Sequence, residues 1–367
     1  MTDYQSLGVR PLINAYATMT KFGGSLMPPE VLAAMNEAAT AFVDLQLLQR
    51  RVGERIAELT RNEAAYVTSG AAAGIVLASA AAVLYKQPDA LKHFPKIAAF
   101  KDQAIVFRSQ RNPYDYAIHQ TGFKVTEIES DPAALRAAIN ERSACVFWFA
   151  RGTDSVEDIS LEAAIAIAAE RDIPLIVDAA AQLPPVSNLW RFTEMGAALA
   201  LFSGGKDLRG PQSSGLMLGR RDLIESIRPI SNPNHGLGRP MKVGKEEMMG
   251  ALAAVERYIK LDHAAREQYC EATVQLFCAA LNPLPGVRAE RAFPNEAGQP
   301  LPRCRVTIDQ GVIGKSADDL VQAFLTQEPA IAVAPDSDAS FYLNPMTLEP
   351  GEELIVRDAC LKLLDEA

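Results

Sequence analysis

A lysine that follows an apolar run is the residue whose type and setting point most directly to chemistry. Lys206 comes three residues after Ser203, at the end of the apolar run 197–202, and glycines stand on both sides of it. Because burial near apolar or cationic groups lowers the pKa of an ammonium group, a lysine placed this way can act as an amine nucleophile and capture a carbonyl compound as an imine. The sequence therefore predicts that Lys206 is a catalytic lysine.

A carboxylate precedes this lysine by 28 positions, at the end of a second predicted strand. The apolar run 173–177 ends there in Asp178. Pyridoxal 5'-phosphate requires a lysine for its Schiff base and an acidic side chain that keeps its ring nitrogen protonated, so that the ring accepts electrons from the substrate. The order of Asp178 and then Lys206, each after a strand, predicts this cofactor and assigns both residues to catalysis.

A turn between a predicted strand and a predicted helix offers a site for the cofactor phosphate. It contains Thr68, Ser69, Gly70 and Ala71. Backbone N–H groups at a helix N-terminus attract anions, and small side chains leave those groups accessible. We expect these four residues to bind the phosphate, with the Ser203 hydroxyl as a further donor; an ordinary helix-capping serine is the alternative.

The remaining cofactor contacts are less determined by the pattern. Gln182 lies one turn after Asp178 and is a candidate for the ring oxygen, although a surface glutamine fits as well. The other face of the ring needs a flat side chain. Arg111 and Tyr114, in the loop 107–116, are both candidates, and the sequence does not choose between them.

An amino-acid substrate needs a cation for its carboxylate, and a guanidinium group is well suited because it donates two parallel hydrogen bonds. Arg303 and Arg305 lie in a predicted strand whose alternation buries Cys304, Val306 and Ile308. The two arginines then share the opposite face. They are candidates for substrate binding, and two solvated surface charges are the alternative.

The elements around these residues predict an α/β fold. Strands are expected at 64–68, 104–107, 124–128, 144–149, 175–178, 198–203 and 215–219, with helices at 71–84, 132–140 and 161–171 between them. Such alternation is typical of a mostly parallel sheet with helices on both faces, and ligands bind at the carboxyl ends of its strands. Thr68, Asp178 and Ser203 all occupy such ends.

Three regions are expected along the chain. Residues 1–45 form an N-terminal arm and helix, and residues 46–244 form a large cofactor-binding domain. Residues 245–367 form a long bridging helical region, 245–281, and a small α+β domain. In that small domain we expect strands at 303–309 and 330–333 and helices at 317–326 and 352–365.

Composition argues against several other classes of protein. The net charge is −9 (36 basic and 45 acidic residues) without a basic run, so nucleic acid is not an expected partner. The five cysteines and four histidines are scattered, which predicts reduced thiols and no metal site. The alanine-rich stretch 66–85 predicts a core helix instead of a membrane span, and without an N-terminal signal segment we expect a cytoplasmic protein.

Four segments resemble a known family. They are RPLINA at 10–15, EAAYVTS at 63–69, IVDAAA at 176–181 and SGGKDLRGPQSSG at 203–215. They resemble the selenocysteine synthase-like group of fold-type-I pyridoxal phosphate enzymes, and within it the D-glucosaminate-6-phosphate ammonia-lyase type. The resemblance implies the fold-type-I transferase architecture: a mostly parallel seven-stranded sheet with helices on both faces, and a small α+β C-terminal domain.

The resemblance also implies roles and an assembly. Lys206 is the expected Schiff-base lysine, Asp178 the partner of the ring nitrogen, and Asn14, in the first of the four segments, a further substrate-binding candidate. A homodimer or higher homo-oligomer is expected. The tRNA binding of true selenocysteine synthases is not expected, because this chain is acidic.

The expected reaction is α,β-elimination: dehydration and deamination of a hydroxy amino acid or amino sugar acid to a 2-oxo acid and ammonia. A racemase, aldolase or aminotransferase acting on a small amino acid is an alternative, because these reactions share their first steps. A non-catalytic homologue that only binds the cofactor is a third possibility. The segment 107–119 departs from the ammonia-lyase pattern, so the sequence leaves the substrate's identity and stereochemistry open.

Overall fold

The structure is a computed structural model that describes residues 3–151 and 158–365. The chain divides into two compact units. Residues 27–261 form the large unit, and residues 1–26 together with 262–367 form the small unit. The N-terminal arm therefore belongs to the same unit as the C-terminal part of the chain.

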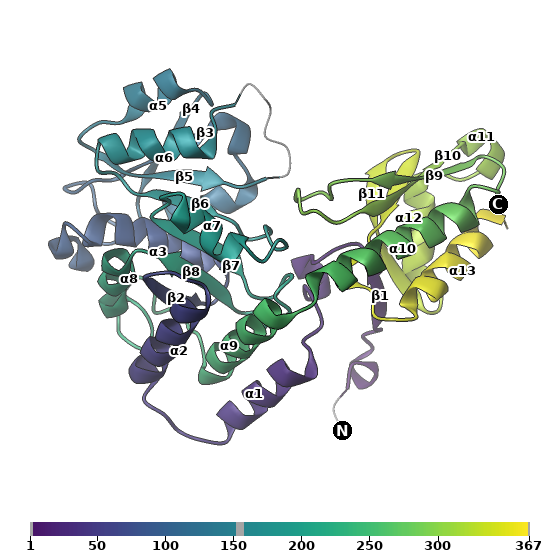
Figure 1. Ribbon diagram of the computed structural model, residues 1–367, viewed down its shortest axis with the longest axis horizontal. Coiled ribbons are helices and arrows are strands. Elements are labelled where there is room, and N and C mark those ends of the chain that lie inside the picture. The colour runs from purple at the N-terminus through teal and green to yellow at the C-terminus, as the bar shows by residue number, and fades with distance from the viewer. Residues whose placement is uncertain (1–2, 152–157, 366–367) are drawn as a thin grey trace. The chain divides into compact units, whose positions relative to one another are not determined.

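A seven-stranded sheet forms the centre of the large unit (Figure 1). Its strands are β2 (Ala64–Thr68), β3 (Gln103–Phe107), β4 (Lys124–Ile128), β5 (Ser143–Phe149), β6 (Leu175–Asp178), β7 (Leu199–Ser203) and β8 (Gly215–Gly219). They are arranged in the order β2-β8-β7-β6-β5-β3-β4. Neighbours are parallel except at β8, which is antiparallel to β2 and to β7. This confirms the predicted mostly parallel sheet.

Helices cover both faces of this sheet. The helices of this unit are α1 (Pro29–Ala39), α2 (Leu45–Leu59), α3 (Ala71–Leu84), α4 (Tyr116–His119), α5 (Pro132–Ala138), α6 (Leu161–Glu170), α7 (Asn188–Glu194), α8 (Arg221–Ile227) and α9 (Lys245–Lys260), of which α1 packs against α9. One apolar core joins the sheet to α2, α5, α6, α7 and α9, and another joins it to α3, α4 and α8. Because both faces are covered, the strands are nearly continuous apolar runs, which is why the sequence pattern located them.

Short 3-10 helices connect several of these elements. They are η1 (Gln5–Leu7), η2 (Thr20–Phe22), η3 (Pro88–Lys92), η4 (Arg108–Gln110), η5 (Pro113–Asp115), η6 (Arg228–Ile230) and η7 (Pro345–Thr347). The sequence pattern did not predict them, nor did it predict α7 and α8, because short helices present too few turns for a periodic signal.

Helix α3 confirms the predicted core helix at 71–84. Every residue from Gly74 to Leu84 is buried. A helix that is apolar around its whole circumference needs cover on all sides, and the sheet, α4 and α8 provide it. Within the described part of the chain, no helix has the length and apolar character required to cross a bilayer.

Strand β2 is an edge of the sheet, and α2 closes it. Gln49, which is buried in α2, donates from Nε2 to the carbonyl oxygen of Val67 at 2.8 Å and accepts from the Val67 N–H at 3.1 Å. The side-chain amide thus takes the place of a neighbouring strand. Gly53 permits this approach, because a Cβ there would lie 2.3 Å from the carbonyl oxygen of Ala65.

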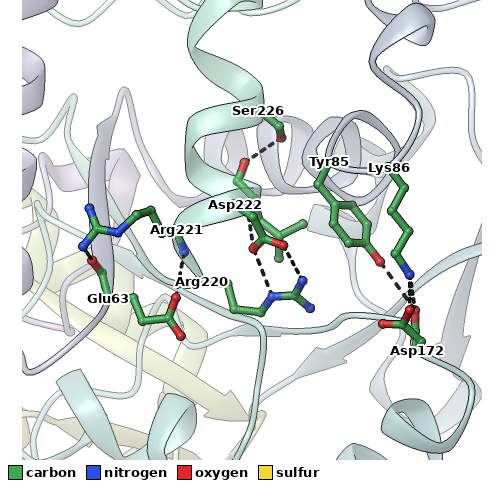
Figure 2. Close-up of polar contacts among 9 residues, drawn as sticks. Glu63, Tyr85, Lys86, Asp172, Arg220, Arg221, Asp222 and Ser226 are labelled. Carbon is green, nitrogen blue, oxygen red and sulfur yellow. Dashed lines mark hydrogen bonds and ion pairs between the residues drawn. The ribbon is translucent and has the colours of Figure 1, made fainter.

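A polar network holds the end of the sheet opposite the carboxyl ends of its parallel strands (Figure 2). Asp172 turns the chain toward β6 with a φ of 52°. The Lys86 ammonium pairs with its carboxylate, and the Tyr85 hydroxyl donates to its carbonyl oxygen at 3.4 Å. Arg220 pairs with Asp222 of α8 and lies 5.2 Å from the Tyr85 ring centroid. These contacts hold the start of β6 in place. They therefore also help to fix the position of Asp178, the last residue of this strand.

The small unit contains a five-stranded sheet with helices. The strands are β1 (Leu12–Ala15), β9 (Val287–Ala292), β10 (Arg303–Ile308), β11 (Ala330–Ser337) and β12 (Ser340–Leu343), in the order β1-β11-β12-β10-β9. The helices are α10 (His263–Leu281), α11 (Gln310–Ile313), α12 (Ala317–Thr326) and α13 (Glu352–Asp365). Cys304, Val306 and Ile308 are buried in the core that these helices form with the sheet, as the alternation in 303–308 predicts.

The division between the units differs from the expected regions in two places. The helical region 245–281 is two helices, because Leu261 is extended and Asp262 caps α10 by accepting from the Ala265 N–H at 2.9 Å. The arm leads into the first helix, α1, as expected, and its residues 12–15 also pair in parallel with β11, which places them in the small unit. Local sequence patterns do not show a pairing over so long a separation.

Candidate active site

The carboxyl ends of β6 and β7 bring the two predicted catalytic residues together. Asp178 ends β6 and is paired in register with Leu201 of β7, five residues before Lys206. Burial raises the pKa of Asp178 to about 6, while a hydrogen bond from the Ala180 N–H and the positive charge of Lys206 act to lower this pKa. The ammonium group is thus close enough to act on a carboxyl group that lies out of solvent.

Close backbone packing shapes the turn that carries Lys206. The Gly204 N–H donates to the carbonyl oxygen of Ser214 at 2.9 Å. A Cβ at Gly204 would lie 2.0 Å from Ser214 Oγ, and one at Gly205 would lie 2.3 Å from Gln212 Oε1. The glycines that flank the lysine are therefore required for contact with the segment 212–214.

The residue after the lysine anchors the turn in the core. Asp207 is buried, and its Oδ2 accepts from the hydroxyl of Tyr258 at 2.5 Å. Tyr258 lies fully buried in α9. The sequence analysis missed both as positioning residues. An acidic side chain next to Lys206 was the available signal, but its partner lies 51 positions further along the chain.

The candidates for phosphate binding lie on adjacent strands at the same edge. Gly215 of β8 is opposite Thr68 of β2 on one side and opposite Ser203 of β7 on the other. A Cβ at Gly215 would lie 2.7 Å from Thr68 Oγ1 and 2.9 Å from the Ala71 nitrogen. The absence of a side chain at this position leaves room for the turn between β2 and α3.

That turn has the properties of an anion site. Gly70 precedes α3 with a φ of 135°, and no side chain caps the helix. The Thr68 hydroxyl donates to the Gly70 carbonyl oxygen at 2.8 Å, which holds the turn closed. The residues Ser69, Gly70 and Ala71 are only partly buried, so the N–H groups of the first turn of α3 are open to a ligand. These residues fit a phosphate group, and with Asp178 and Lys206 they could hold pyridoxal phosphate.

The other residues predicted to contact the cofactor, Gln182, Arg111 and Tyr114, follow strands at the same edge of the sheet. Their side chains differ in their partners and in their exposure. Gln182 donates to the carbonyl oxygen of Ala150, just after β5, at 3.4 Å. Arg111 forms ion pairs with Asp115 and with Glu127. Tyr114 is exposed, and its N–H is capped by Asn112. The ring-covering side chain therefore stays a prediction, with Arg111 held by two carboxylates and Tyr114 open to solvent.

Gln110 is a residue of this loop that the sequence analysis missed. It is buried, and its Oε1 accepts from the Phe149 N–H at 3.0 Å. This bond ties the segment after β3 to the end of β5. A polar residue inside a loop gave no signal that distinguished it from its neighbours.

The two predicted carboxylate-binding arginines lie on the same strand face but differ in their partners. Arg305 Nε and its terminal nitrogen donate to one oxygen of Asp336 at 3.0 and 2.8 Å. The Arg303 side chain is only 11% exposed, pairs with Glu296 at 3.2 Å and stacks 3.9 Å from the centroid of the Tyr342 ring. Among the residues that the structure describes, Arg303 Nε has no acceptor. Arg303 is therefore the arginine with donor capacity left.

The side chain of Asn14 is used in its own turn. Its Oδ1 accepts from the Tyr16 N–H at 3.0 Å, and its Nδ2 donates to the Ala17 carbonyl oxygen at 2.9 Å. Its role toward a substrate stays a prediction. Across residues 3–151 and 158–365, no three His, Cys, Asp or Glu side chains are grouped as metal ligands.

Comparison with known proteins finds relatives that align with nearly the whole chain. No family model matches the sequence. A 5'-C-glycyluridine monooxygenase-decarboxylase from Streptomyces sp is 31% identical over 99% of this chain and 92% of its own. A D-glucosaminate-6-phosphate ammonia lyase from Salmonella typhimurium is 30% identical over 96% of this chain and 95% of its own.

Solved structures agree with these sequence relatives. The structure of a D-glucosaminate-6-phosphate ammonia-lyase superposes with a TM-score of 0.85 and 29% identity, covering 100% of both chains. These relatives are pyridoxal 5'-phosphate enzymes with the same fold, a mostly parallel seven-stranded sheet with helices. The chain belongs to the selenocysteine synthase-like group of fold-type-I pyridoxal phosphate-dependent enzymes.

Proposed function

We propose that this protein is a lyase that removes water and then ammonia from a hydroxy amino acid or an amino sugar acid and releases a 2-oxo acid. The observation that carries the proposal is the buried Asp178 beside Lys206 at the carboxyl edge of the sheet. The relationship to a D-glucosaminate-6-phosphate ammonia lyase over nearly the whole of both chains supports this reaction type.

Pyridoxal phosphate, when bound, supplies an electron-accepting ring that stabilises negative charge at the α-carbon of an amino acid. The chain's own residues supply the rest. The first turn of α3, with Thr68 and Ser203 beside it, would hold the phosphate. The Asp178 carboxylate would accept a hydrogen bond from the ring nitrogen and keep it protonated.

Lys206 is the residue that moves protons. Its Nζ takes the proton from the α-carbon of the substrate and then donates a proton to the departing β-hydroxyl, which leaves as water. The enamine that results takes up water, and a 2-oxo acid and ammonia leave. The Asp207–Tyr258 hydrogen bond keeps the turn that carries Lys206 in place. Nζ therefore stays close to the α-carbon of the substrate and to the carbon that bears the β-hydroxyl.

Arg303 is our candidate for the substrate carboxylate. Its guanidinium is largely desolvated, pairs with Glu296 through one terminal nitrogen and retains an unpaired Nε among the described residues, whereas Arg305 donates to Asp336 through both Nε and a terminal nitrogen. Guanidinium groups with low exposure bind carboxylates more strongly than exposed ones do, because less water competes.

The proposal includes a homo-oligomer in the cytoplasm. Three apolar side chains of the large unit, Leu32, Phe42 and Val43, are exposed, and Phe42 is fully so. Phe42 and Val43 are consecutive in the chain, and adjacent exposed apolar side chains are typical of contact surfaces, so we assign this segment to a contact with a second copy of the chain. None of the five cysteines, all of which lie in the described part of the chain, forms a disulfide, which suits a reducing compartment; cell fractionation tests this location.

A second candidate function follows from the other relative. The monooxygenase-decarboxylase is as similar to this chain as the ammonia lyase is. An enzyme of that kind would consume O2 and release CO2 instead of releasing only ammonia and a 2-oxo acid, so the two reactions are distinguished by their products.

The reaction is tested with Lys206→Ala. We expect the wild-type protein, loaded with pyridoxal phosphate, to show a visible band that borohydride removes, and to release ammonia and a 2-oxo acid in equal amounts from a member of a hydroxy amino acid and amino sugar acid panel. Lys206→Ala should lose the band and lower the rate by about 10³-fold or more, because the proton-transferring amine is gone. Lys260→Ala, a change on the exposed side of α9, serves as the control.

Other outcomes of this assay point to the other readings. O2 uptake with CO2 release would contradict the elimination reaction and would support the second candidate, a monooxygenase-decarboxylase. A retained band without turnover of any panel member would favour a cofactor-binding homologue that is not catalytic, and a racemised product or a released aldehyde would favour the racemase or aldolase.

The raised pKa of Asp178 predicts a pH-dependent stability in the cofactor-free protein. Its folded pKa of about 6 lies above the ordinary value of 3.8 for an aspartic acid, so its contribution to stability is complete below pH 3.8 and is lost as the pH rises through 6. The loss is about 3 kcal/mol, at 1.36 kcal/mol per pKa unit. Between pH 4 and pH 7, the free energy of unfolding of the wild type should therefore fall by about this amount relative to Asp178→Asn.

Urea denaturation of both proteins at several pH values measures this difference. Parallel curves for the wild type and Asp178→Asn would show that the carboxyl group is not desolvated in the folded chain. In the cofactor-loaded wild type the difference should shrink, because a protonated ring nitrogen compensates for the burial of the carboxylate.

Arg303 and Arg305 form a matched pair for testing substrate binding. We expect Arg303→Gln to raise the KM for the substrate found in the panel by about tenfold or more, since a charged hydrogen bond is worth roughly 1.5–3 kcal/mol. Arg305→Gln should change the KM by less than about twofold, because the Arg305 guanidinium already forms an ion pair with Asp336. Equal effects of the two substitutions, or a larger effect of Arg305→Gln, would contradict the assignment.

The oligomer is tested with Phe42→Ser. Analytical ultracentrifugation should find the wild type as a dimer or larger species at micromolar concentration and Phe42→Ser with at least a tenfold weaker association, because about one aromatic side chain of apolar burial is removed. Leu354→Ser, which removes an exposed apolar side chain of α13 in the small unit, should leave the association unchanged. A monomeric wild type would refute the proposal.

A further inference from the structure

The large unit contains a polar cavity outside the Asp178–Lys206 region. Its volume is about 280 Å³. It lies at the start of α2, beside the edge strand β2 and the segment 228–234. Its lining consists of Asp44, Gln46, Leu47, Gln49, Arg50, Tyr66, Arg228, Asn232 and Asn234. None of these residues takes part in the chemistry proposed above.

The amide side chains of the wall are already engaged with the protein. Gln49 binds the backbone of Val67 with both its donor and its acceptor. Asn234 accepts from Gln46 at 3.0 Å and donates to the carbonyl oxygen of Arg228 at 2.9 Å. Asn232 donates to the carbonyl oxygen of Val243 at 3.2 Å. These bonds fix the shape of the cavity and leave the amides little capacity for a ligand.

The two arginines retain donor groups. Glu225 lies between them, 2.9 Å from Arg228 Nε and 3.2 Å from a terminal nitrogen of Arg50. Among the described residues, the side chain that accepts a hydrogen bond from the Arg228 guanidinium is that of Glu225. The donor of this bond is Nε. Both terminal nitrogens of Arg228 therefore have hydrogen atoms to donate. With Asp44 in the lining and Glu225 between the arginines, the two guanidinium groups are balanced by two carboxylates, so what the arginines offer a ligand is their open donor groups.

The position of Arg228 is fixed by its surroundings. Its side chain is 17% exposed, and its guanidinium carbon lies 5.8 Å from the centroid of the Tyr66 ring. Tyr66 is itself buried in β2. A guanidinium held in place loses little conformational entropy when it binds a ligand, which favours recognition by its planar pair of terminal N–H groups.

We propose that this cavity binds the phosphate group of a small metabolite, with Arg228 and Arg50 as its ligands. The open donors are cationic and belong to guanidinium groups, whose geometry matches the oxygen atoms of a phosphate. Asp44 is the acidic side chain of the lining, and one of its oxygens is occupied by the Gln46 and Leu47 N–H groups at the start of α2. At about 30 Å³ per water molecule, the cavity has room for roughly nine waters, or for a phosphate with a short polar chain.

Inorganic phosphate is the first probe, and the cofactor-loaded protein is the material, so that the phosphate turn at Ser69 is already filled. We expect calorimetric titration to show one site per chain, with a rise in the melting temperature at constant ionic strength and no change in the visible band of the cofactor. A phosphate ester of a three-carbon polyol should bind more tightly than inorganic phosphate if the site belongs to a metabolite, and about equally if it belongs to the free ion. The unphosphorylated polyol should not bind.

Two substitutions and two controls make the test specific. Arg228→Gln should weaken phosphate binding at least tenfold, and Arg50→Gln, at a half-exposed position that tolerates change, should weaken it severalfold. Arg136→Gln removes an exposed arginine paired with Glu170 in the same unit and should have no effect. Phe42→Ser should also bind normally, which would separate this cavity from the proposed contact between copies.

The proposal is overturned if the wild type shows no saturable binding. It is equally overturned if Arg228→Gln and Arg50→Gln bind phosphate as the wild type does, because the stabilisation would then be the general effect of an excluded salt. Both substitutions leave Lys206 and Asp178 in place, so the visible band reports whether each variant is folded and loaded.

Discussion

The buried carboxyl group of Asp178 is the constraint on which the arrangement of the large unit depends. A carboxylate without solvent is costly unless a cation and hydrogen bonds compensate for it. Here the Ala180 N–H and the charge of Lys206 compensate only in part, since burial still raises the pKa of Asp178 to about 6. A protonated nitrogen at this carboxylate would complete the compensation. The protein thus keeps a locally unfavourable group whose partner is a ligand, which is the expected property of a binding site.

The rest of the large unit serves to hold that edge of the sheet open and rigid. Gly204, Gly205 and Gly215 lack side chains where a Cβ would meet the neighbouring backbone or Thr68, so three segments can converge at one edge. The Asp207–Tyr258 bond anchors the lysine turn to α9, and the network around Asp172 fixes β6 from its other end. Asp178 is therefore positioned as the last residue of a strand, and Lys206 by a turn that is packed against the segment 212–214 and anchored to α9.

Much of this arrangement could be predicted from the sequence because its signals are local. Strands covered on both faces are continuous apolar runs, and the strand that ends in Asp178 and the one before Lys206 have few other interpretations. Contacts between distant segments could not be predicted. The pairing of residues 12–15 with β11, the Gln49 amide that closes β2 and the Tyr258 partner of Asp207 each join positions whose relation is not periodic. The break between α9 and α10 was missed because both flanking segments are helical.

The arginines show why residue type alone does not determine a binding role. In the sequence, Arg303 and Arg305 are equivalent, since both lie on the same face of one strand. The structure separates them through their neighbours: Asp336 accepts from Nε and a terminal nitrogen of Arg305, whereas Glu296 pairs with one terminal nitrogen of Arg303 and leaves its Nε unpaired within the described chain. The same reasoning applies to Arg228, whose guanidinium is largely buried and is bound by Glu225 through Nε, so that its terminal nitrogens keep hydrogen atoms to donate. Where a guanidinium group keeps donors beside a cavity, those donors indicate the chemistry of the missing ligand.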